Sequence, residues 1–180
     1  NVLGAEQHGH MDKIGYELYA KLLREELSDS RETDAELDIR VTAYIPESYI
    51  HTSSARMDAY KEIAELTSLK EETELISTLT DVYGELPLET ENLINVVAVK
   101  YLAKKLGVAA VTVRKGETSL KFRDLKAFSC EKIQKAITEF SGRIKIIMSR
   151  APEIRFNAEK GGNSEMLVVL NSFLRFADEK

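Results

Sequence analysis

Two histidines and one cysteine are the residues whose chemistry stands out first. His8 and His10 are two positions apart, which would point both side chains to one face of a strand and could begin a metal site. No third ligand pattern such as HExxH accompanies them, so a polar loop explains the pair better. Cys130 has no histidine in a recognisable catalytic pattern, and we expect a buried structural cysteine. The sequence therefore predicts neither a catalytic nor a metal site, and a small metal- or cysteine-dependent enzyme remains an alternative.

Charged and glycine-containing runs raise the possibility of ligand binding. The run Lys160–Ser164, KGGNS, precedes a helix and could hold an anion, but it lacks the patterns of phosphate-binding loops, so we expect a loop-to-helix junction. The acidic run Glu71–Glu74 opens a helix, where acids favour the N-terminus, and a solvated face is the simpler interpretation. The cations in Lys100–Lys105 suit a helix carboxyl end, and direct DNA binding there is the weaker alternative.

Composition narrows the class of protein. The chain has 180 residues, of which 43% are hydrophobic, and its 25 basic and 30 acidic residues give a net charge of −5. This acidic balance argues against a dedicated nucleic-acid module. The single cysteine excludes an internal disulfide and is consistent with the cytoplasm. No apolar run long enough for a membrane span and no signal peptide are visible, and the start at Asn1 without methionine indicates a piece of a longer protein.

Three helical segments between Ser54 and Gly107 would form the centre of the fold. Ser54 is expected to cap the first, whose apolar stripe faces a core: Met57, Tyr60 and Ile63. Ser68 and Glu71 form a capping box at the start of the second. The third begins at Pro87 and is apolar over more than half its girth, so we expect it to be buried.

Alternating apolar and polar residues predict the strands. They lie at Glu36–Ile45, Ala109–Arg114, Thr118–Arg123, Arg143–Ser149 and Glu153–Ala158, and the second and third form a hairpin. In the last two we expect these side chains to face inward: Ile144, Ile146, Met148, Ile154 and Phe156.

The order of these elements predicts the fold class. Strands that follow one another, with the helices grouped apart, indicate an α+β fold: a mostly antiparallel sheet of about four to five strands packed with a helical layer, preceded by an N-terminal helix. Ser129 is expected to cap a short helix, and Asn163 or Ser164 the final one. The polar run at residues 28–35 suggests a division into domains 1–34 and 35–180.

Three stretches taken together resemble a known family: NVLGAEQHGHMDKIGYELY, DIRVTAYIPESYI and LTDVYGELPLETENLINVVAVKYLAKKLGV. They are similar to the carboxyl-terminal part of the bacterial transcription-repair coupling factors, the Mfd family. The resemblance covers most of the chain up to about Val108. It implies a cytoplasmic protein without membrane contact, of which this chain, expected to be monomeric, is one regulatory part.

The resemblance assigns the first residues to the tail of a translocation motif shared with RecG helicases. The matching positions are Gly4, Glu6, Gln7, Gly9 and His10. A glutamine amide both donates and accepts hydrogen bonds, which suits coupling of ATP hydrolysis to movement on duplex DNA. The arginine-containing half of the motif and all ATPase motifs are absent from this sequence, so we expect no ATPase activity, and ATP and magnesium only in the motor domains of the parent protein.

From about Glu36 onward, the resemblance implies a non-catalytic regulatory domain. Such a domain packs on the amino-terminal module that recruits UvrA and hides it until the motor engages stalled RNA polymerase. UvrA, RNA polymerase and duplex DNA are then indirect partners. Asp81, just before Tyr83, matches an acidic position of that surface, whereas Thr78 stands where relatives can carry glutamate. We therefore expect an interdomain interface at these three residues, with a weaker or displaced contact at Thr78.

Overall fold

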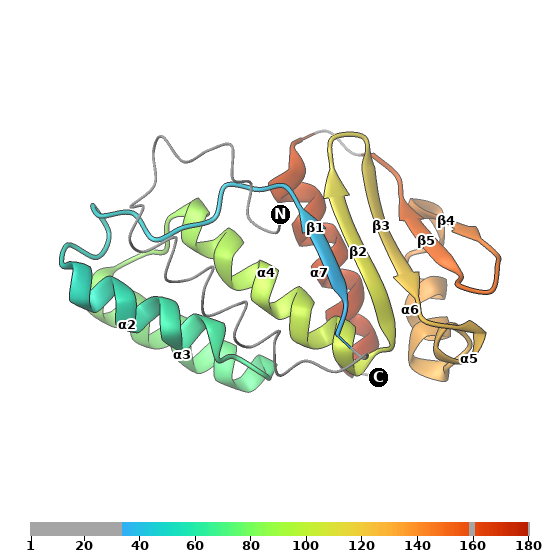
Figure 1. The fold of residues 1–180 in the computed structure, drawn as a ribbon, viewed down its shortest axis with the longest axis horizontal. Coiled ribbons are helices and arrows are strands. Elements are labelled where there is room, and N and C mark those ends of the chain that lie inside the picture. The colour runs from blue at the N-terminus through green and yellow to red at the C-terminus, as the bar shows by residue number, and fades with distance from the viewer. Residues whose placement is uncertain (1–33, 159–160, 180) are drawn as a thin grey trace. The chain divides into compact units, whose positions relative to one another are not determined.

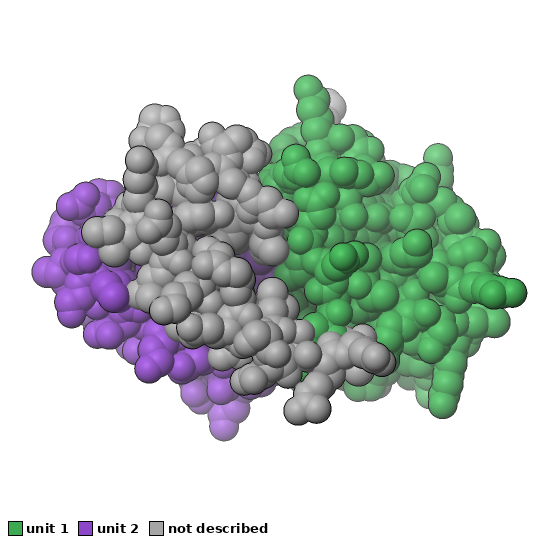
Figure 2. Space-filling model, viewed as in Figure 1, with its two compact units in different colours: residues 1–2, 32–40, 99–180 green, residues 3–31, 41–98 purple. Residues whose placement is uncertain are grey.

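The computed structural model describes residues 34–158 and 161–179 (Figure 1). They fall into two compact units. The described parts are residues 34–40, 99–158 and 161–179 in unit 1, and residues 41–98 in unit 2 (Figure 2). The translocation-motif residues and the predicted N-terminal helix lie outside the described residues. The division at residue 34 therefore stays a prediction.

Unit 1 is built on a five-stranded sheet with the order β1-β2-β3-β5-β4. The strands are β1 Glu36–Ile39, β2 Val108–Arg114, β3 Glu117–Phe122, β4 Ile144–Ile147 and β5 Glu153–Phe156. β1 pairs with β2 in parallel, and the remaining pairs are antiparallel. This arrangement confirms the predicted α+β class with a mostly antiparallel sheet.

One face of the sheet is covered by the last helix, α7 Asn163–Glu179, which packs on β2, β3 and α6 Glu131–Glu139 (Figure 1). The apolar side chains of α7 are buried, and the ring of Phe173 lies 5.3 Å from that of Phe140 and 5.6 Å from that of Phe156. These edge-to-face contacts join the helical layer to the sheet.

The strand β4 departs from its predicted burial. Ile144 is buried, but 41% of Ile146 and 60% of Met148 are exposed, so the expectation that both face the core is wrong. The reason is topological, since β4 is the last strand of the sheet and has a neighbour on one side alone among the described strands. Ile154 and Phe156 of β5, one strand further in, are buried as predicted.

The segment after β3 contains two short helices where one was predicted. Asp124 caps α5 Leu125–Phe128 by accepting a hydrogen bond from the Ala127 amide, and Ser129 ends that helix. Cys130 is exposed at the start of α6, so the prediction of a buried cysteine is wrong. The extra turn of α5 shifts the register and places the thiol outside the core.

Unit 2 contains an extended segment followed by helices. These are α2 Ser53–Ala64, α3 Leu69–Tyr83 and α4 Leu88–Lys105, whose last residues belong to unit 1. Thr52, rather than Ser54, caps α2. The core side chains of α4, including Leu93, Val97 and Leu102, are almost fully buried, which confirms its central place.

The first strand ends at Ile39, earlier than its alternation predicts. Beyond Ile39, side chains of α4 donate hydrogen bonds to backbone carbonyls that would otherwise pair with a neighbouring strand. The Asn92 amide donates to the Thr42 carbonyl at 3.0 Å, and the Thr90 hydroxyl donates to the Tyr44 carbonyl at 3.1 Å. The alternating burial persists, but helix side chains now satisfy the polar groups of the segment.

Helix α2 buries Tyr60 and Ile63 as predicted, but the prediction that Met57 also faces the core is wrong. Met57 is 36% exposed, whereas the neighbouring Arg56 is 5% exposed. The Arg56 guanidinium donates to the carbonyls of Ile50 and His51 at 2.7 and 2.9 Å. A buried guanidinium needs such acceptors, and these two lie in the turn before α2, which rotates the helix toward Arg56.

Candidate interaction surface at the end of helix α3

Helix α3 is fixed at its start by side-chain caps. The Ser68 hydroxyl accepts the Glu71 amide at 3.2 Å, and the Glu71 carboxylate accepts the Thr67 amide at 2.9 Å and its hydroxyl at 2.7 Å. Hydrogen bonds from the Thr67 side chain, then from its backbone, lower the pKa of Glu71. The capping box predicted from the sequence is present, with Thr67 as the backbone donor.

The carboxyl end of α3 is anchored by Tyr49. Its hydroxyl lies 2.9 Å from the Gly84 carbonyl oxygen and 3.3 Å from that of Leu79. Its ring lies 5.7 Å from the Tyr83 ring, tilted by 57°. Burial, followed by the nearby Tyr83, raises the pKa of the Tyr49 hydroxyl, which therefore stays protonated as a donor. The backbone on both sides of Tyr83 is thus held in place.

Asp81 is exposed in the last turn of α3, which contains no basic residue. A carboxylate at this position faces the negative end of the helix dipole, which costs about 0.3–1 kcal/mol. Helix stability therefore does not account for Asp81.

Four exposed residues define what we call the α3 patch: Thr78, Asp81, Val82 and Tyr83. Thr78 and Asp81 share one helical face because they are three residues apart. The Thr78 hydroxyl donates to the Glu74 carbonyl at 3.0 Å, so its proton is used within the helix. Tyr83, 38% exposed, offers one side to solvent and the other to Tyr49.

The family resemblance assigned Thr78, Asp81 and Tyr83 to a candidate interface, and it did not single out Val82 or Tyr49. Val82 is 64% exposed, although it is a large apolar side chain. Its position next to Asp81 is the sole signal that the sequence offered for it. Tyr49 is 35 residues from Gly84, and no sequence pattern links the two.

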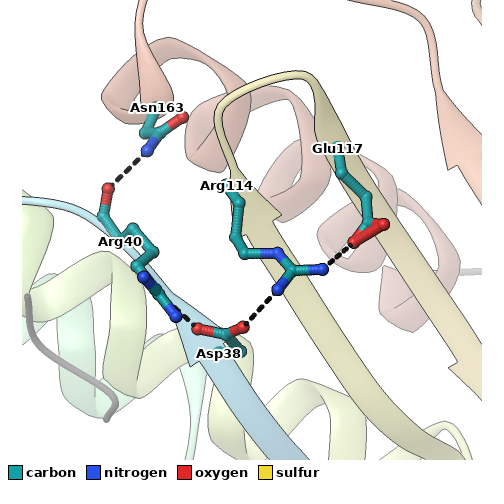
Figure 3. Close-up of polar contacts among 5 residues, drawn as sticks. All are labelled: Asp38, Arg40, Arg114, Glu117 and Asn163. Carbon is teal, nitrogen blue, oxygen red and sulfur yellow. Dashed lines mark hydrogen bonds and ion pairs between the residues drawn. The ribbon is translucent and has the colours of Figure 1, made fainter.

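A second polar surface lies on the exposed face of the sheet in unit 1 (Figure 3). Asp38 accepts from Arg40 at 3.0 Å and pairs with Arg114 at 3.6 Å, and Arg114 contacts Glu117 at 2.6 Å. The hydrogen bond with Glu117 raises the pKa of Arg114. The Asn163 amide donates to the Arg40 carbonyl at 2.7 Å. These charges neutralise one another within the chain, which favours ordinary solvation over partner binding at this face.

A family model described as the TRCF domain matches residues 39–133. The chain belongs to the TRCF domain family. The α3 patch lies inside the matched segment, whereas β4, β5 and α7 lie beyond it.

The chain is also similar in sequence to individual transcription-repair-coupling factors. The transcription-repair-coupling factor of Bacillus subtilis (strain 168) is 33% identical over 112 residues, which are 58% of this chain and 10% of that protein. The factor of Mycobacterium tuberculosis (strain CDC 1551 / Oshkosh) is 30% identical over 135 residues, 66% of this chain and 11% of that protein. The chain thus spans about a tenth of the length of these curated relatives.

A solved structure shows the same fold. The crystal structure of the C-terminal domain of a transcription-repair coupling factor superposes with a TM-score of 0.69 and 23% sequence identity. The match covers 81% of this chain and 92% of that one.

The lysines at the end of α4 are engaged within the TRCF chain. Lys104 lies 3.1 Å from Asp34, and Lys105 lies 3.7 Å from Asp178. Phosphate binding would have to break these pairs. The weaker alternative, direct DNA binding by this helix end, gains no support from its geometry.

The groove around Cys130 offers no recognisable catalytic partner. It has a volume of about 720 Å³ and is lined by Lys105, Arg123 and Lys132 beside the thiol. Its two carboxylates, those of Asp124 and Asp178, are engaged in a helix cap and an ion pair respectively. Across residues 34–158 and 161–179, no group of three or more potential metal ligands occurs, and no helix is long and apolar enough to cross a membrane.

Proposed function

We propose that this TRCF domain is a non-catalytic regulatory module of an ATP-dependent DNA translocase that couples stalled RNA polymerase to nucleotide excision repair. In the resting parent protein it masks the module that recruits UvrA, and engagement of RNA polymerase releases it. Family membership supports the general role. The observation that carries the proposal is the exposed Asp81 in the last turn of α3, where a carboxylate works against the helix.

The α3 patch has the chemistry of a reversible docking surface. Asp81 would pair with a cation of the masked module, and Val82 and Tyr83 would contact its apolar surface. Charge complementarity sets orientation and reversibility more than raw affinity, which suits a contact that must open. Because Tyr49 already holds the backbone at Gly84, binding orders little of the chain.

Thr78 makes this docking surface weaker than one with a second carboxylate would be. Its hydroxyl proton is bound to the Glu74 carbonyl, so the side chain offers a partner no charge. We expect Thr78→Glu to tighten the contact by about 0.2–1 kcal/mol, the contribution of an exposed ion pair. Tighter masking would lower recruitment of UvrA.

Calorimetry of this chain against the separately purified UvrA-recruiting module tests the proposal. The informative variant is Asp81→Arg, which places a cation at the helix carboxyl end and should leave the helix at least as stable. Glu62→Arg, an equal charge reversal on the exposed side of α2, is the control. We expect Asp81→Arg to weaken binding severalfold and Glu62→Arg to leave it unchanged.

The protein concentrations in this measurement must reach those at which a weak intramolecular contact would form between separate chains. Covalent linkage in the parent supplies an effective concentration of about millimolar, so a weak affinity suffices for masking. Binding should also weaken as salt rises, because exposed ion pairs are screened. Equal binding by both charge-reversed variants would contradict the docking role of the α3 patch.

A further inference from the structure

The free edge of β4 is the strongest unexplained feature of unit 1. β4 pairs with β5 on one side, and among the described strands none pairs with its other side. Figure 1 shows β4 as the last strand at the end of the sheet opposite β1. An unpaired edge presents a row of backbone donors and acceptors that another strand can use.

The hydrogen-bond register identifies which backbone groups point outward. The Asn157 amide donates to the Arg143 carbonyl at 2.9 Å, which makes this a hydrogen-bonded pair. In an antiparallel ladder such pairs alternate with pairs whose N–H and C=O groups point away. The register Lys145 with Arg155 continues the bonded set, so the polar backbone groups of Ile144 and Ile146 face the free edge.

Exposed apolar side chains accompany this edge. Ile146, Ile147 and Met148 follow one another and are 41%, 39% and 60% exposed. Three consecutive exposed apolar residues are unusual unless they serve binding. They lie on both faces of β4, since successive side chains alternate.

The charges around β4 are almost all positive, although the chain as a whole carries −5. Basic residues occupy the strand and its flanks: Arg143, Lys145, Arg150 and Arg155. Lys145 is directly opposite Arg155 in the register. Glu153 is the sole carboxylate from residue 143 to 156, and it pairs with Arg155 at 3.3 Å. Like charges facing each other cost stability that an added acidic strand would recover.

We propose that β4 docks an extended segment of a protein partner in which apolar and acidic residues alternate, added to the sheet as a sixth strand. The backbone groups of Ile144 and Ile146 bind the added strand. The apolar side chains of Ile146 and Met148 pack on its apolar residues, and Lys145 and Arg150 pair with its carboxylates. Strand addition of this kind takes affinity from the backbone and specificity from the side chains.

Charge also excludes the simplest competitor, a second copy of this chain. An antiparallel pairing of two β4 strands would bring both sets of Arg143, Lys145 and Arg150 together. A lysine on an edge strand discourages such self-pairing and does not discourage an acidic strand. The surface therefore selects a partner different from itself.

Fluorescence anisotropy of the whole chain with short labelled peptides tests the proposal. The probe peptide alternates valine with glutamate, and the matched peptide has lysine in place of glutamate. We expect the glutamate peptide to bind at least about tenfold more tightly, and Lys145→Glu to reverse this preference. Equal binding of the two peptides would overturn the proposal.

Ile146 offers a paired test of the backbone contact. Ile146→Pro removes an outward N–H that β5 does not use, whereas Ile146→Val keeps it. We expect the proline variant to lose peptide binding and the valine variant to keep it within about twofold. Binding that survives in a folded Ile146→Pro variant would contradict strand addition.

Hydrogen exchange of the unmutated chain tests the same backbone contact without any substitution. The amides of Ile144 and Ile146 should be protected when the glutamate peptide is added. Unchanged exchange at these amides, or a dimer in sedimentation that Ile146→Pro dissociates, would overturn the proposal. Asp81→Arg should leave peptide binding unchanged, which separates this site from the masking role of the α3 patch.

Discussion

The hydroxyl of Tyr49 lies 2.9 Å from the carbonyl oxygen of Gly84 and so joins the segment before α2 to the end of α3. Gly84 has a φ of 91°, which residues other than glycine rarely adopt, and its carbonyl oxygen accepts the hydrogen bond from the tyrosine. This bond anchors the backbone at the end of the α3 patch.

Tyr49→Phe should lower the free energy of unfolding by about 1 kcal/mol, because the part-buried Gly84 carbonyl loses its donor while the ring contact with Tyr83 remains. Tyr44→Phe is the matched control on the extended segment and should change stability less. Urea denaturation followed by circular dichroism measures both. An equal loss in the two variants would show that the bond to Gly84 adds nothing.

Alkaline pH should destabilise unit 2 through Tyr49. Burial raises the pKa of this hydroxyl above its ordinary value of 10, and Tyr83 raises it further. The folded state therefore holds its proton more tightly than the unfolded state, so stability is full below pH 10 and falls as pH rises above it. Tyr49→Phe should flatten this decline in thermal melts between pH 9 and about pH 11. A slope identical to that of the unmutated chain would contradict the role of Tyr49.

Acidification should act on the start of α3. Hydrogen bonds from Thr67 lower the pKa of Glu71 below 4.5, so its contribution to stability is present above pH 4.5 and disappears as pH falls through the lowered pKa. Glu71→Gln should remove this part of the acid dependence. Melting curves from neutral pH down to below pH 4.5 measure the difference between Glu71→Gln and the unmutated chain. Glu62→Gln on α2 is the control.

Alanine substitutions at two glycines, Gly107 and Gly116, distinguish the cost of backbone strain from the cost of steric overlap. Gly107 and Gly116 have φ of 73° and 80°, so alanine at either costs about 1–2 kcal/mol in backbone strain. At Gly107 the added methyl group would also lie 2.7 Å from the Ala127 side chain, whereas at Gly116 it meets nothing within 4 Å. Gly107→Ala should therefore destabilise unit 1 more than Gly116→Ala does. Comparable denaturation midpoints would show that α5 moves aside freely.

Local patterns predicted the helices of unit 2 and the hairpin well, because their signals lie within the segments themselves. The capping box at Ser68 and the glycine at position 84 mark the two ends of α3. The early end of β1 was not predictable in this way, because the segment after it is hydrogen-bonded by two distant side chains of α4, Asn92 and Thr90. The parallel pairing of β1 with β2 is equally a property of distant segments.

The same limit applies to the candidate sites. Asp81 was assigned to the interface through the family resemblance, and that assignment stays a prediction; the structure shows that the residue is exposed. The anchor at Tyr49 and the exposure of Ile146 depend on tertiary neighbours, which a single sequence does not reveal. Alternation alone placed Ile146 in the core, since the pattern of an edge strand resembles that of an inner one.

Capture of UvrA by the full-length parent of this chain tests the masking role most directly. The parent and its Asp81→Arg variant would be compared in the absence of RNA polymerase, with Glu62→Arg as the control. Masking by the α3 patch predicts that Asp81→Arg raises capture by up to about fivefold, because an exposed ion pair contributes about 0.2–1 kcal/mol. The control should leave capture unchanged. Equal capture by all three proteins would contradict the account.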